Sequence, residues 1–200
     1  MSITALSSQL RLALEDPADK FNREQVLNAV DEFVAGSVSS EAPEVQLFRV
    51  EEELQIVYND VVDHTSLGHT EVFLGVLHHL RPLLPSTSVI STWFDLVLRP
   101  ALREPRLPTT SVTHAKELII FAAENEDQRH PEKVHEFRRR LVDHLLDAYN
   151  EGSGDDILDW AKLDQEQRDK RCLWKGNLED VLIKFGLNCP VVRACHGTCI

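Results

Sequence analysis

The stretch HTEVFLGVLHHLRPLLPSTSVISTWFDLVLRPALR, residues 69–103, contains two helical patterns of hydrophobic residues separated by a turn. The apolar positions are Phe73, Leu77, Leu80 and Leu84 in the first pattern, and Ile90, Trp93, Val97 and Ala101 in the second. Steps of three and four place such residues on one face of an α-helix. The stretch therefore predicts a helical hairpin, which must bury its apolar face against a neighbour.

Proline and serine residues define the turn between the two patterns. Pro82 and Pro85 should end the first helix, because proline lacks an amide N–H and its ring clashes with the preceding turn. Ser86 or Ser88 can accept a hydrogen bond from the free amides that begin the second helix.

Three further helical segments precede this hairpin. The apolar positions of the first are Ile3, Leu6, Leu10 and Leu14. Asn22, three residues before Gln25, resembles a capping box and predicts a second helix that ends near Gly36. Pro43 suits the first turn of a third helix, whose outer face should be acidic at residues 51–53, all glutamate. The apolar stripe of that helix is Leu47, Val50, Leu54, Val57 and Val61.

The same pattern continues towards the C-terminus. A hydroxyl residue at 109–111 can cap a helix that is followed by a polar turn at 125–130. Pro131 should open a long helix, ended by the Gly-Ser-Gly sequence at 152–154. Residues 155–173 are of mixed polarity and favour one short helix. The last segment with clear helical spacing is residues 174–187, with Leu178, Val181, Leu182 and Phe185 on one face.

Helix pairs beginning every 40 to 45 residues or so favour an α-solenoid over a globular bundle, since HEAT and armadillo repeats have a similar period. No segment of four or more residues alternates apolar and polar character between turn signals, so no strands are expected. The sequence therefore predicts an all-α fold of about eight helices, a HEAT-like solenoid with degenerate repeats. We expect this domain to span residues 1–187, followed by a cysteine-rich, disordered tail at 188–200.

The charge of the chain argues against nucleic acid as a partner. The net charge is −12, and residues 1–100 hold 15 acidic against 6 basic side chains. An acidic surface repels phosphate backbones. The basic cluster at 138–140 is typical of a solvated helix face, with a docking patch for an acidic surface as the alternative. Neither a signal peptide nor an apolar run of roughly 20 residues is present, which predicts a cytoplasmic protein without a transmembrane segment.

The sequence contains no phosphate-binding loop, nucleophile elbow, HExxH motif or EF-hand loop. The adjacent His78 and His79 should point about 100° apart on a helix and so cannot form a ligand pair. His135 and His144 would likewise face different ways. We therefore predict no catalytic, cofactor-binding or metal-binding residue and no cofactor. A metal-dependent hydrolase that uses histidines such as His78 or His144 is the competing hypothesis.

The tail NCPVVRACHGTCI has the composition of a metal site. Cys189, Cys195, His196 and Cys199 could supply three sulfurs and one nitrogen to zinc. Their spacing is unfamiliar for zinc, however, and a frayed chain end is the favoured interpretation. We predict that this tail is dispensable for folding, whereas the segment from residue 174 to Phe185 is essential.

Two longer segments resemble the N-terminal domain of the hamartin family in its fungal form. They are LHHLRPLLPSTSVISTWFDLVLRPALREP at 77–105 and EFRRRLVDHLLDAYNEGSGDDILDWAKLDQEQRDKRCLWKGNLEDVLIKFGL at 136–187. The likeness spans about residues 5–187 and departs from the family at the tail, where the family continues into further helices and a coiled coil.

The resemblance implies a non-catalytic, HEAT-like scaffold domain with protein partners. In the family these are a tuberin-like subunit, in a complex that restrains TOR signalling through a small GTPase, or a second copy of the scaffold. The alternative is a generic helical-repeat adaptor in a trafficking or kinase-scaffold assembly.

Overall fold

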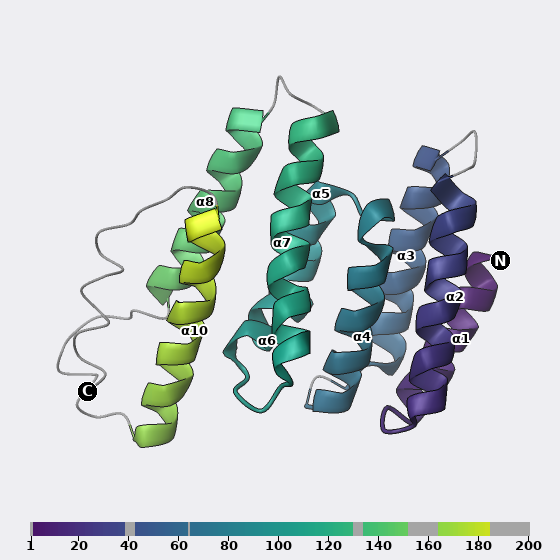
Figure 1. Cartoon of the computed structure of the whole chain (residues 1–200), viewed down its shortest axis with the longest axis horizontal. Coiled ribbons are helices and arrows are strands. Elements are labelled where there is room, and N and C mark those ends of the chain that lie inside the picture. The colour runs from purple at the N-terminus through teal and green to yellow at the C-terminus, as the bar shows by residue number, and fades with distance from the viewer. Residues whose placement is uncertain (1, 39–42, 64, 130–133, 152–163, 185–200) are drawn as a thin grey trace.

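A computed structural model describes residues 2–38, 43–63, 65–129, 134–151 and 164–184 (Figure 1). All regular elements in these ranges are helices, which confirms the all-α prediction and its count of about eight. The main helices are α1 (Ile3–Glu15), α2 (Lys20–Val38), α3 (Pro43–Val61), α4 (Leu67–Leu80), α7 (Thr109–Arg129), α8 (Val134–Glu151) and α10 (Gln165–Lys184). Between α4 and α7 lie η1 (Arg81–Leu83), α5 (Ser86–Ser88), η2 (Val89–Leu98) and α6 (Arg99–Arg103). No helix in these ranges is long and apolar enough to cross a membrane.

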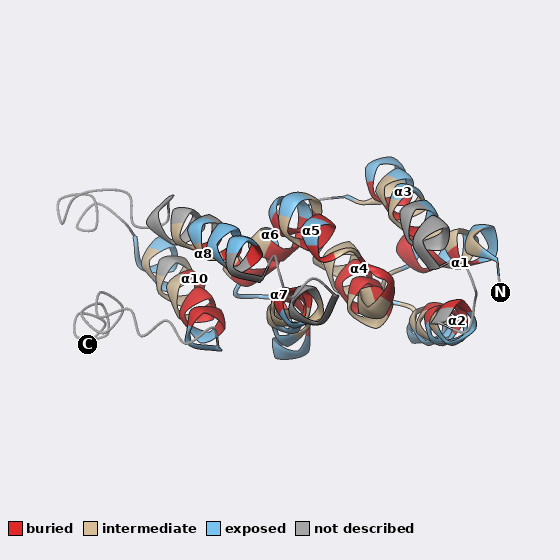
Figure 2. Ribbon diagram, turned by 90° about the horizontal axis from the view of Figure 1, so that it is seen from above, coloured by how far each residue is buried: buried red, intermediate tan, exposed pale blue. Residues whose placement is uncertain are grey.

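The helices form an elongated array two layers thick (Figures 1 and 2). Along one side α2, α4, α7 and α10 follow one another, each in contact with the next. The other side is formed by α1 and α3, then by η2 and α6, and finally by α8. Buried residues lie between the layers, and exposed residues cover the outer faces.

The predicted apolar stripes form the core of this array. In the first helix Leu6, Leu10 and Leu14 are buried, and in the third Leu54 and Val57 are buried, all as predicted. Leu83, Leu84, Val89 and other aliphatic residues join them into one continuous cluster. Helical spacing alone therefore identified the inward faces of these helices correctly.

An aromatic cluster lies in the core where α3, α4 and η2 meet. The ring of Tyr58 lies 5.0 Å from that of Phe73 and 6.0 Å from that of Trp93, and the latter two are 5.5 Å apart. The Tyr58 hydroxyl donates to the Leu96 carbonyl at 2.6 Å. Burial raises the pKa of Tyr58, so the phenol keeps the proton that it donates.

The second helix of the central hairpin is a π-helix over Val89–Leu98, whereas the sequence predicted an α-helix. The amide of Arg99 accordingly bonds to the carbonyl of Phe94, five residues back. Adjacent residues Trp93 and Phe94 are both buried, so the inward face is broader than a single stripe. Apolar steps of three and four do not separate the two helix types, which is why the sequence missed this one.

Two predicted helix caps are wrong. α2 begins at Lys20, and the Asp19 carboxylate accepts from the amide of Phe21 at 2.9 Å, so Asn22 lies inside the helix. Asp19 provides the same capping chemistry three residues earlier. α5 begins without a side-chain cap, and the Ser86 hydroxyl is buried without a hydrogen-bond partner.

Helices α7 and α10 are longer than predicted. α7 begins at Thr109, with Ser111 buried in its first turn, and it extends to Arg129 through most of the expected polar turn. α10 begins nine residues before the predicted helix, at a capping box in which Asp164 and Gln167 each accept from the other's amide, at 2.8 and 3.2 Å. The cysteines of the tail and residues 155–163 lie outside the described residues.

Candidate functional site: a polar seam across α2, α4 and α7

Charged and polar side chains connect α4 to α2 on one side and to α7 on the other. We call this group the polar seam. It consists of Arg23 and Asp31 on α2, Glu71, His78 and His79 on α4, Arg81 on η1, and His114 and Glu117 on α7.

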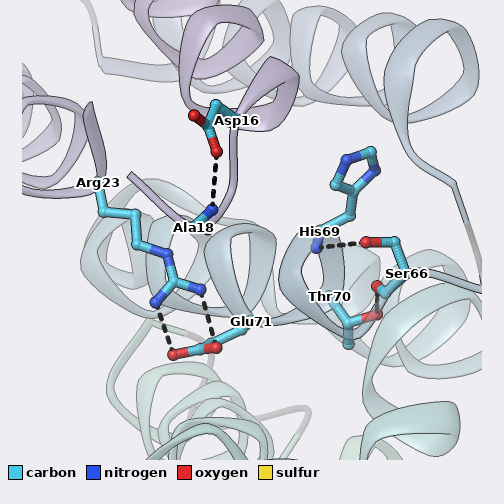
Figure 3. Close-up of polar contacts among 7 residues, drawn as sticks. All are labelled: Asp16, Ala18, Arg23, Ser66, His69, Thr70 and Glu71. Atoms are coloured by element: carbon cyan, nitrogen blue, oxygen red, sulfur yellow. Dashed lines mark hydrogen bonds and ion pairs between the residues drawn. The ribbon is translucent and has the colours of Figure 1, made fainter. Parts of the chain in front are cut away.

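An Arg–Glu pair joins α2 to the first half of α4. Figure 3 shows the two terminal nitrogens of Arg23 facing the two carboxylate oxygens of Glu71, at 2.9 and 2.8 Å. Both side chains are less than one-third exposed. Such two-point contacts fix the orientation of the partners as well as their distance, so this pair sets how α2 lies on α4.

The start of α4 is fixed beside this pair. Ser66 caps the helix, because its hydroxyl accepts from the amide of His69 at 3.3 Å (Figure 3). A Cβ built on Gly68 would lie 3.0 Å from two carbons of Pro17, in the turn between α1 and α2. The absence of a side chain at Gly68 thus lets the first turn of α4 approach that turn closely.

The adjacent histidines of α4 contact opposite neighbours. His79 Nδ1 lies 2.7 Å from a carboxylate oxygen of Asp31 on α2, and His78 Nε2 lies 2.6 Å from one of Glu117 on α7. Their rings are 5.9 Å apart. The predicted divergence of the two side chains is what allows α4 to bond to both flanking helices.

His114 stacks on His78 across the contact between α4 and α7. The ring centroids are 4.2 Å apart and the planes differ by 17°. Arg81 lies beside the same ring, with Nη1 3.1 Å from each ring nitrogen of His78, and it donates to the His78 carbonyl at 2.8 Å. No motif in the sequence points to His114, although its three-residue spacing from Glu117 places the two on one helix face.

The pKa values of both stacked histidines are shifted in the same direction. Burial lowers the pKa of His78, opposed by the hydrogen bond to Glu117, and burial also lowers the pKa of His114. Both rings are therefore predominantly neutral at neutral pH. A neutral His78 that donates to a carboxylate must have its proton on Nε2.

A small cavity of about 120 Å³ adjoins the seam. Its lining is Arg23, Val26, Leu27, Glu71, Val72, Gly75, Thr110, Ser111 and His114. Pockets for cofactors and substrates are typically about 300–1,000 Å³. This space therefore suits one side chain of a partner better than a cofactor.

His69 and the described arginines of the basic cluster do not join the seam. His69 accepts from the amide of Asp63 through Nδ1, at 2.9 Å. In the basic cluster Arg140 pairs with Glu136 on its own helix and both it and Arg139 are exposed, as on a solvated face. The side chains of His64, His135 and His144 lie outside the described residues. Within the described part of the chain, no group of three or more His, Cys, Asp or Glu side chains could hold a metal ion.

Comparison of the chain with protein-family models, with curated proteins and with solved structures finds no match in any of the three. The function of the chain is therefore inferred from its residues, from their arrangement and from the resemblance described above.

Proposed function

We propose that this chain is a non-catalytic scaffold of hamartin type, built as a HEAT-like solenoid with degenerate repeats. The observation that supports it best is the serial packing of helices in two layers. Successive helix pairs begin at Ile3, Pro43, Ser86 and Val134, a spacing of about 40 to 48 residues. Each pair buries its apolar face against the next, as in repeat proteins, and leaves long outer faces for partners.

The partner proposed is a tuberin-like subunit or a second copy of the scaffold, in the cytoplasm, within a complex that restrains TOR signalling. The resemblance over residues 77–105 and 136–187 supports this choice. Large apolar side chains on the layer formed by α2 to α10 are available for such contacts, since Phe21 is 64% exposed and Ile183 is 57% exposed.

Co-precipitation of the full chain with tuberin and, separately, with full-length hamartin tests the proposal. Specific recovery of either supports it. Failure to bind both, together with specific recovery of an unrelated trafficking or kinase assembly, would favour the adaptor alternative. Phe21→Ser and Ile183→Ser should lower recovery without lowering the melting temperature, because both side chains are exposed. Leu12→Ser, at an exposed position on the other layer, is the matched control.

A further inference from the structure

The contact between α4 and α7 contains an unusual concentration of ionisable groups. His78 of α4 lies against His114 of α7 at a ring distance of 4.2 Å, with Arg81 beside His78 and Glu117 bonded to His78. The side chain of His78 is only 13% exposed. The positive charge of a protonated ring must therefore be stabilised mainly by these neighbouring groups rather than by water.

The charges around the stack favour its neutral state. From α7, Glu117 is the carboxylate that faces the stack, and from η1 Arg81 contributes a permanent positive charge. On the side of α2, Asp31 is bonded to His79, which adds positive charge near His114 when protonated. With both stacked rings protonated, they and Arg81 would place three cations beside Glu117, because Arg23 and Glu71, which line the adjoining cavity with His114, are paired with each other. Charge repulsion therefore strongly disfavours the binding of a second proton by the stacked histidines.

We propose that the His78–His114 stack is a proton-sensitive latch, which fixes α7 against α4 at neutral pH and loosens when the solution is acidified. The stack connects two consecutive helices of one layer, so loosening it would change how the first half of the array is joined to the second. This inference does not depend on the proposed scaffold function.

The direction of the pH effect follows from the two histidines. Because their pKa values are lowered in the folded protein, the unfolded chain binds protons first as the pH falls. The stabilisation is complete above the pKa of free histidine, about 6.5, and is lost as the pH falls through the lower folded values. The stabilisation by the two histidines should therefore begin to decrease near pH 6.5 and decrease further at lower pH.

Thermal unfolding of the full chain at pH 7.5 and pH 5.8 tests the latch; both values lie above the isoelectric point of about 5.1. In His114→Phe, an aromatic ring remains against His78 but cannot bind a proton. The fall in melting temperature between the two pH values should be larger in the wild type than in His114→Phe, by roughly 2–4 °C. In Glu52→Gln, a control at an exposed position of α3 outside the seam, the fall should equal that of the wild type. Equal falls in the wild type and in His114→Phe would overturn the proposal.

Hydrogen exchange of the wild type gives a second readout that needs no variant. Protection factors for the amides of α7 around His114 should fall severalfold between pH 7.5 and 5.8, while those of α1 stay constant. A uniform change, or none, contradicts the latch. The same measurement with EDTA should give the same result; a pH response that chelator abolishes would identify a metal site instead.

Discussion

The two sides of α4 are joined to the rest of the protein by opposite kinds of chemistry. On its inner side Phe73 packs against Tyr58 and Trp93, in a cluster from which water is excluded. Along its two flanks the polar seam contacts α2 and α7 through ion pairs and stacked histidines, which are partly exposed. Apolar burial is large and independent of pH, whereas partly exposed ion pairs are weak and respond to protons and salt. The comparison indicates that the aromatic cluster stabilises the fold and the polar seam adjusts it.

The largest effect is expected at the centre of the aromatic cluster. Trp93→Ala should lower the free energy of unfolding by about 3–5 kcal/mol, since it removes a side chain that is 1% exposed and contacts both other rings. The loss should be the same at pH 7.5 and pH 6.5. Urea denaturation followed by circular dichroism measures this loss of stability. A loss below about 1 kcal/mol would contradict the claim that the aromatic cluster stabilises the fold.

Breaking the Arg–Glu pair of the polar seam should cost less. Glu71→Gln should lower the free energy of unfolding by about 1–2 kcal/mol, because the partly buried guanidinium of Arg23 loses its counter-charge. Urea denaturation in low salt shows the effect best. Glu52→Gln, at an exposed position on α3, serves as control and should change stability by less than about 0.5 kcal/mol. If Glu71→Gln lowered the free energy of unfolding as much as Trp93→Ala, the polar seam would contribute as much to stability as the aromatic cluster, which contradicts the comparison.

A polar bond at the edge of the aromatic cluster allows a finer test. Tyr58→Phe keeps the ring against Phe73 and removes only the hydrogen bond to the Leu96 carbonyl. The expected cost is about 1 kcal/mol, since a partly buried carbonyl loses its donor. Thermal unfolding detects a change of this size. No change would mean that packing alone holds α3 against η2.

The smallest effects concern two helical glycines with different surroundings. Gly176→Ala in α10 should stabilise the protein by about 0.5–1 kcal/mol, because a Cβ meets nothing within 4 Å and alanine favours helix. Gly68→Ala should destabilise it by a similar amount, since its Cβ would press on Pro17. The two melting temperatures should therefore move in opposite directions. Equal stabilisation by both substitutions would show that the turn at Pro17 shifts to make room for the added Cβ at little cost in stability.

The helices were predictable because their apolar periodicity is a local property. Leu54 and Val57 lie where their spacing puts them, and Pro43 begins α3 as expected. The early start of α10 was missed because its first turns are polar, although Asp164 and Gln167 provided a capping signal. In the first turns of α10 no apolar residues recur at helical spacing, so the sequence pattern does not indicate a helix in that segment.

The polar seam was not predictable, because its contacts join residues distant in the sequence. His78 and Glu117 are 39 residues apart, and His79 and Asp31 are 48 apart. Sequence spacing gave the divergence of the two histidines correctly but not what each would meet. Which helices become neighbours depends on the packing of the whole array, so such pairs appear only with the fold.

Far-ultraviolet circular dichroism of the wild type at pH 7.5 and pH 5.8, at 25 °C, tests the central comparison most directly. If the aromatic cluster stabilises the fold and the seam only adjusts it, the helical signal should be the same at both pH values, although the melting temperature is lower at pH 5.8. A loss of helical signal at pH 5.8 and 25 °C would contradict this account, because it would show that the fold depends on its ionisable groups.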